Sequence, residues 1–150
     1  QPIMSYNFGA RNYARVRQTF RLLLRTTLAV TVTAFLVVTL FPRPLALIFN
    51  DDRELVELVG RVMPIFFGGI WAFGAQMACQ AAFMAMGQAK TSLFLALLRK
   101  VILLVPLAIV LPLVTRNVMG IYVAEPVADV LASATTLTLF LRKRKTLLPE

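Results

Sequence analysis

Four long stretches of the sequence are predominantly apolar, and short segments rich in charged and turn-forming residues separate them. The stretches cover residues 22–41, 62–86, 93–114 and 119–141. Each is close to the roughly 20 residues that an α-helix needs to cross the hydrocarbon core of a bilayer. The pattern predicts an all-α, polytopic membrane protein with four transmembrane helices.

Two segments depart from a plain apolar helix. The third stretch contains Pro106 and Pro112, so we expect it to be kinked, because a proline removes a backbone hydrogen bond. Between the first two stretches, residues 43–60 include "DDRELVELV". Acids near its start favour a short amphipathic helix on the extracytoplasmic surface, with Asn50 or Asp51 as the N-cap.

Composition supports a membrane setting, since 59% of the residues are hydrophobic and only 15% are charged. A net charge of +9 would ordinarily raise nucleic acid as a partner. The basic residues instead form short blocks between apolar stretches, which is typical of membrane topology signals. We therefore expect membrane lipids, and no nucleic acid, as partners.

Counting basic residues on alternate sides of the four predicted spans predicts the orientation. Most fall on one side, which the positive-inside rule makes cytoplasmic, and both ends of the chain then lie in the cytoplasm. One side holds Arg11, Arg15, Arg17, Arg21, Arg25, Lys90, Arg99, Lys100, Arg142, Lys143, Arg144 and Lys145; the other holds Arg43, Arg53, Arg61 and Arg116. We expect Arg11, Arg15, Arg17, Arg21 and Arg25 to be cytoplasmic anchors.

Little in the sequence favours an enzyme. Cys79 is the only cysteine and histidine is absent, which removes the commonest metal ligands. No phosphate-binding glycine loop or nucleophile constellation is visible. We expect no catalytic residue, no metal site and no cofactor.

Three motifs together resemble the C-terminal part of a multidrug and toxic compound extrusion (MATE) transporter of the bacterial drug-efflux branch. They are "QPIMSYNFGARNYARVRQTFR", "QAAFMAMGQAKTSLFLALLRK" and "GIYVAEPVAD". The first is the most specific. The resemblance implies twelve helices in two six-helix lobes, of which this chain would hold the end of the eighth and all of helices nine to twelve, as a fragment missing its N-terminal lobe.

The same resemblance implies a multi-pass protein of the cell inner membrane that exports cationic or amphipathic compounds in exchange for protons or sodium ions. Two features of the family are missing from this sequence. The ion-coupling acid of the first helix lies outside it. The acid that one sodium-coupled branch carries on the tenth helix has no counterpart in residues 62–86. The coupling ion therefore stays open.

Glu125 and Asp129 are the first candidates for an ion or substrate site, because their spacing puts both on one face of the fourth span. A carboxylate inside a membrane requires a partner or a water-filled cavity. The functional interpretation is a cation-responsive pair, and the alternative is a structural pair held by Arg116, hydroxyl groups or water. For Arg99 and Lys100, the ordinary expectation is snorkelling to headgroups, with ion pairing as the alternative.

Further candidates lie on the second span. Gln76 and Gln80 share a helical face, with Met77 and Trp71 nearby, and such a mixture could line a substrate cavity. The alternative is that the amides join helices by hydrogen bonds. Gly68, Gly69 and Gly74 favour close helix packing in the same span.

Two other functions remain alternatives to efflux. A lipid-linked precursor flippase of the same superfamily would require a strongly basic cavity, to which the second and fourth spans contribute no base. A non-transporting four-span membrane subunit is the other.

Overall fold

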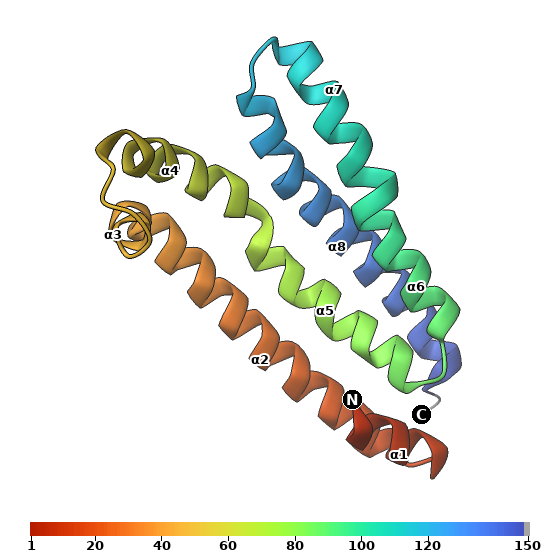
Figure 1. Cartoon of the computed structure of the whole chain (residues 1–150). Helices are drawn as coiled ribbons and strands as arrows, with labels where there is room; N and C mark the ends of the chain where they lie inside the picture. The colour runs from red at the N-terminus through yellow and green to blue at the C-terminus, as the bar shows by residue number, and fades with distance from the viewer. Residues whose placement is uncertain (149–150) are drawn as a thin grey trace.

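The computed structural model describes residues 1–148, and its architecture is entirely helical over that range. The helices are α1 (Pro2–Gly9), α2 (Tyr13–Leu40), α3 (Pro42–Leu47), α4 (Arg53–Phe66), the 3₁₀ turn η1 (Phe67–Gly69), α5 (Ile70–Ala85), α6 (Ala89–Leu97), the π-helical segment η2 (Leu98–Leu104), α7 (Val105–Thr115) and α8 (Met119–Leu147). These elements join end to end into four long rods, and both termini lie at one end of the bundle (Figure 1).

Four helical stretches of the described residues are long and apolar enough to span a membrane: Tyr13–Leu40, Arg53–Ala85, Ala89–Thr115 and Met119–Leu147. The prediction of an all-α protein with four spans is therefore confirmed. Each rod is longer than the apolar stretch that predicted it. The extra residues are mostly polar, as at the start of α2 and the end of α8, because a helix can continue beyond the hydrocarbon core where water and headgroups solvate its side chains.

The N-terminal motif forms a helix and a tight turn before the first span. α1 ends at Gly9, and Arg11 takes a left-handed conformation with φ of 57°. Asn12 then caps α2, because its Oδ1 accepts a hydrogen bond from the backbone N–H of Arg15 at 3.3 Å. Arg11 lies in this turn, and the other four predicted anchor arginines follow along the first part of α2, at the end of the bundle that holds both termini.

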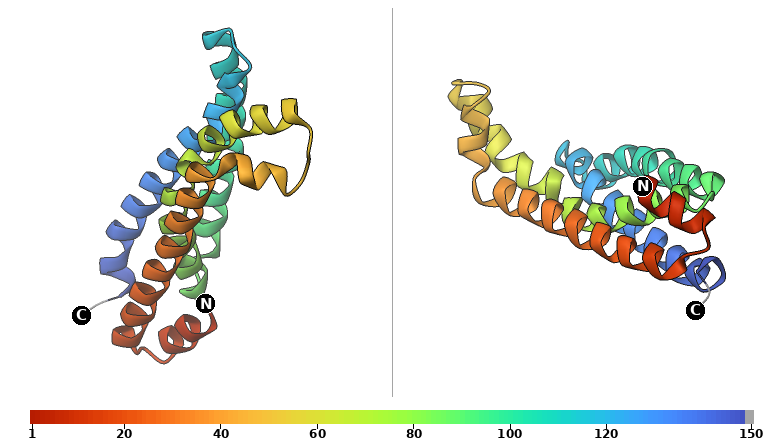
Figure 2. Two further views of the ribbon diagram at one scale, coloured as in Figure 1. Left: turned by 90° about the vertical axis from the view of Figure 1, so that its left-hand side faces the viewer. Right: turned by 90° about the horizontal axis from the view of Figure 1, so that it is seen from below.

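The segment after the first span contains the short helices α3 and α4. α4 starts at Arg53, and helical structure continues from it through η1 into α5. Its N-cap is Asp52, whose Oδ1 accepts from the N–H of Glu54 at 2.9 Å, so the expectation of Asn50 or Asp51 was wrong. The views from the side and from below show α3 and α4 projecting from the end of the bundle (Figure 2).

Glycines bring the rods into backbone contact at three crossings. A Cβ at Gly74 would meet Thr31 Oγ1 and lie 2.9 Å from the carbonyl oxygen of Thr27, both on α2. A Cβ at Gly69 would lie 2.7 Å from the Cβ of Asp129 on α8. Gly120 packs in the same way against the backbone of Leu111 on α7. The small residues thus serve close packing, as their spacing predicted.

The third span is irregular, as its two prolines predicted, but the main irregularity comes before them. Residues Leu98–Leu104 form a π-helix, which joins α6 to α7. Pro106 stands in the first turn of α7, where its missing N–H is tolerated, and Pro112 lies inside that helix. A π-helical insertion is often found at functional positions, and this one contains Arg99 and Lys100.

The largest buried cluster lies toward the end that holds the termini. Phe83 on α5 and Phe140 on α8 are fully buried, with ring centroids 5.5 Å apart, and Phe20 of α2 stacks on Phe140 at 4.4 Å. Met4 of α1 and Leu95 of α6 belong to the same cluster. This aromatic contact joins α2, α5 and α8 into one unit.

Adjacent glycines provide a matched test of the packing between η1 and α8. The Gly69→Ala substitution should destabilise the protein by about 1 to 3 kcal/mol, because the new methyl group would press on the backbone and side chain of α8. In Gly68→Ala the nearest atom is 3.6 Å away, an ordinary contact, and the free energy of unfolding should change by less than about 0.5 kcal/mol. Equal losses for the two variants, measured by denaturant titration in detergent, would contradict the packing.

Candidate functional site

Arg99 of η2 lies between two carboxylates of α8. Its Nε donates to Asp129 Oδ1 at 2.5 Å, and its Nη2 donates to Glu125 Oε1 at 3.0 Å. Lys100 Nζ lies 3.2 Å from the same Glu125 oxygen. We call these four residues the charge cluster. It joins two basic and two acidic side chains, so its formal charges cancel.

Burial distinguishes the members of the charge cluster. The side chains of Arg99 and Glu125 are each 14% exposed and that of Asp129 is 6% exposed, whereas the side chain of Lys100 is 55% exposed. At ~1.5 Å per residue, Arg99 lies about 9 Å and Asp129 about 15 Å inside the nearest ends of the apolar stretches 93–114 and 119–141. Removing water strengthens the ion pairs between the buried members and makes any unpaired charge costly.

Local structure explains why these side chains meet. Glu125 and Asp129 are one helical turn apart, so both face η2 from α8. Gly69 faces Pro126 and Asp129 of α8. Because a glycine has no side chain, the second span can approach α8 closely at this point. The guanidinium group of Arg99 also makes a cation–π contact with Phe73 of α5. The distance from Arg99 Cζ to the ring centroid is 4.1 Å.

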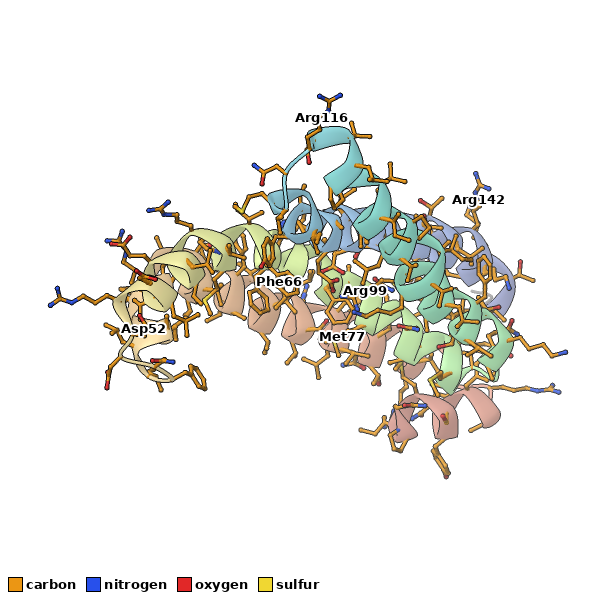
Figure 3. All side chains as sticks on the ribbon, turned by 45° about the horizontal axis from the view of Figure 1, so that its top comes forward. Asp52, Phe66, Met77, Arg99, Arg116 and Arg142 are labelled. Carbon is orange, nitrogen blue, oxygen red and sulfur yellow. The ribbon has the colours of Figure 1, made fainter. Side chains whose placement is uncertain are left out.

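The structure corrects two expectations about these charges. Arg99 does not extend to a membrane surface but pairs with both acids, so the snorkelling interpretation was wrong for Arg99. Arg116 does not hold the acid pair; it takes a left-handed conformation in the turn between α7 and α8. Figure 3 shows Arg116 pointing outward at the tip of the molecule, whereas Arg99 points into the bundle.

A line of buried polar groups continues along α8 from the charge cluster. Asp129, Ser133 and Thr136 follow one another at helical spacing and are at most 5% exposed. Ser133 Oγ, Thr136 Oγ1 and Gln76 Oε1 of the neighbouring α5 are buried without a hydrogen-bond partner. Most buried polar atoms are paired, because leaving one unpaired costs about 1 to 3 kcal/mol. Sequence reasoning missed Ser133 and Thr136, although their spacing from Asp129 was a readable signal.

The other predicted site residues have different surroundings. Gln80 donates from Nε2 to the backbone carbonyl of Ser92 at 3.0 Å, so its amide joins α5 to α6 as the alternative interpretation expected. Met77 and Trp71 are about half exposed. The four residues predicted to form a cavity wall therefore have three different surroundings. Gln76 is buried, Gln80 joins two helices by a hydrogen bond, and Met77 and Trp71 are exposed.

The charge cluster is suited to binding cations in exchange for Arg99. Its carboxylates are held apart from lipid by their own basic partners, and a proton or another cation that reaches them competes with the guanidinium group for the same oxygens. Among residues 1–148, no group of three or more acids, cysteines or histidines could hold a metal ion. The charge cluster can therefore form and break ion pairs reversibly inside a helical bundle.

A polytopic bundle with compensated charges inside its spans has the features of the membrane transport proteins. The comparisons with known proteins narrow that class. The MatE family model matches residues 1–110. A structure of the MATE multidrug transporter DinF-BH in complex with a small molecule is similar over 97% of this chain and 32% of that chain, with 32% sequence identity and a TM-score of 0.86. A solved chain described as protein A gives the same values.

The chain belongs to the MatE family, the multidrug and toxic compound extrusion transporters. It spans about a third of the length of the solved transporter chains that it matches. No curated protein matches its sequence. The family assignment made from the three motifs is confirmed, and so are the all-α fold and the multi-pass membrane character predicted from the apolar stretches. The roles of the individual site residues stay predictions.

Removing Arg99 tests how much the charge cluster contributes to the free energy of unfolding. In Arg99→Met two carboxylates lose their buried partner, and we expect a loss of about 3 to 5 kcal/mol in the free energy of unfolding. Lys100→Met is the control, and its loss should stay below about 1 kcal/mol because Lys100 is more than half exposed.

The variant Arg99→Met/Glu125→Gln/Asp129→Asn should recover much of the stability lost in Arg99→Met, because it removes all three buried charges together. Equilibrium unfolding of the purified protein measures all three variants. If the triple variant is less stable than Arg99→Met, Arg99 is not held by these acids.

Proposed function

We propose that this chain is part of the C-terminal lobe of a secondary active multidrug transporter, which exports cationic or amphipathic compounds in exchange for protons or sodium ions. The observation that carries the proposal is the charge cluster, in which one buried arginine pairs with two carboxylates from another span. A solved relative that is a multidrug transporter with a small molecule bound supports a small-molecule substrate. Both ends of the chain lie on the cytoplasmic side in this proposal, and the anchor arginines contact that surface.

The charge cluster gives the transporter two alternative states. In one, Arg99 occupies the carboxylates and holds η2 against α8. In the other, a proton, a sodium ion or a cationic substrate satisfies Glu125 or Asp129, and Arg99 is released from that oxygen. The guanidinium group and the incoming cation compete for the same carboxylate oxygens. Binding of the cation therefore favours the state in which Arg99 is released, and pairing with Arg99 disfavours cation binding. Such competition is the property that exchange transport requires.

The buried hydroxyl groups of α8 extend the same mechanism. Ser133 and Thr136 form a polar line from Asp129 toward the end of the bundle that holds the termini, and Gln76 adds an amide from α5. A hydroxyl group both donates and accepts hydrogen bonds, so this line provides a route for a proton or a hydrated ion to the carboxylates. Met77 and Trp71 of α5, which are about half exposed, provide an adaptable apolar surface for substrates.

Substituting the carboxylates should uncouple transport. In the full-length protein, Glu125→Gln/Asp129→Asn should lower ion-driven export by roughly 5- to 150-fold, the usual range of a coupling energy. Efflux of the cationic dye ethidium from proteoliposomes, driven in turn by an imposed proton gradient and an imposed sodium gradient, measures the loss and identifies the ion. The matched control is Glu57→Gln, an exposed acid of α4 that pairs with Arg61.

To separate function from folding, the Arg99→Met/Glu125→Gln/Asp129→Asn variant should remain folded and fail to export. Normal export by this variant would show that the charge cluster has no part in coupling. Export that ignores both gradients in the unmodified protein would contradict antiport itself.

The polar line permits a test in which stability and activity move in opposite directions. Ser133→Ala/Thr136→Val removes two unpartnered buried hydroxyl groups, so the variant should be at least as stable as the unmodified protein. Its ion-driven export should nevertheless fall. Thr135→Ala/Thr138→Val is the control, because these exposed hydroxyl groups bond to backbone carbonyls of their own helix. A stable variant with full export would remove the polar line from the mechanism.

A further inference from the structure

A groove of about 760 Å³ lies between α2 and α8, at the end of the bundle that holds both termini. Its apolar wall includes Phe20 and Leu24 of α2 and Leu137 and Leu141 of α8. The stacked rings of Phe20 and Phe140 join the two helices there, at a centroid distance of 4.4 Å. None of these groups belongs to the charge cluster.

Four basic side chains line the same groove. Arg17 and Arg21 come from successive turns of α2, and Arg144 and Lys145 come from the last turn of α8. Among the residues that the structure describes, no acid lines it. The groove thus combines an apolar wall with positive charge contributed from both sides.

The position of the groove matches a membrane surface. α2 begins and α8 ends at this level, and each changes here from basic to apolar residues along its length. A ligand that follows the groove from its basic end would enter the hydrocarbon depth beside Leu24 and Leu137. A free phosphate ion would use only the charges, whereas a phospholipid uses both the charges and the apolar wall.

We propose that this groove is a binding site for one anionic phospholipid, whose phosphate lies among Arg21, Arg144 and Lys145 and whose acyl chain lies along the leucines. Bound in this way, the lipid bridges the first and fourth spans and supplements the aromatic contact between them. The site is separate from the proposed transport mechanism and requires no particular orientation of the protein.

The test compares two double variants that lose the same charge. Arg21→Gln/Arg144→Gln removes one groove residue from each helix, and Lys90→Gln/Arg142→Gln removes two basic residues that lie at the same end of the bundle but outside the groove. Arg142 points away from the bundle in Figure 3. The full-length protein is placed in phosphatidylcholine nanodiscs that contain phosphatidylglycerol, and retained lipid is measured by native mass spectrometry.

We expect the groove variant to bind phosphatidylglycerol roughly tenfold to thirtyfold more weakly, from about 1 kcal/mol per basic residue, and the control variant to bind as the unmodified protein does. Glycerol phosphate, which carries the headgroup without acyl chains, should not compete. Equal weakening in both variants would reduce the effect to general surface charge and overturn the site. Unchanged binding in the groove variant, or full competition by glycerol phosphate, would overturn it as well.

Discussion

Arg99 is a buried cation in a lipid-spanning bundle, and it is tolerated because Glu125 and Asp129 lie within hydrogen-bond distance. A lone charge at this depth is costly by several kcal/mol on any scale, and two lone carboxylates on one helical turn would also repel each other. Pairing Arg99 with both carboxylates removes the cost of the lone charge and the repulsion between the two acids. The arrangement of the third and fourth spans is therefore tied to this contact, and the rest of the bundle packs so as to permit it.

Several local features serve that contact. The π-helical segment η2 carries Arg99 and Lys100 and joins α6 to α7, while the left-handed Arg116 completes the turn into α8. Gly69 allows the second span to pass directly over Pro126 and Asp129. The ring of Phe73 lies against the guanidinium group in a cation–π contact. The same surroundings that stabilise the charges also exclude water, so a cation that reaches the carboxylates meets strong competition from Arg99 and must alter the contact to bind.

Hydrophobic length alone predicted the four spans, since the cost of burying polar backbone leaves a helix as the only open-chain solution in lipid. It could not place the boundaries. Helical structure continues from α4 through η1 into α5, so the apolar pattern did not mark the residue at which this helical stretch begins. Arg99 was misjudged for a related reason. Its depth invited snorkelling, and its true partners lie on another helix that local spacing does not reveal. The antiparallel pairing of the third and fourth spans about the turn at Arg116 would have brought Arg99 near Asp129, and the excess of one charge sign in each span was a usable signal.

The central claim is that cation binding and the Arg99 contact exclude each other, and the separation of the third and fourth spans reports on it directly. Spin labels at Lys90 on α6 and Arg142 on α8, in the full-length protein in nanodiscs, allow that separation to be measured by electron–electron double resonance. The account predicts that acid pH or added sodium shifts the distance distribution, and that Arg99→Met gives the shifted distribution without either cation. Identical distributions under all these conditions would contradict it.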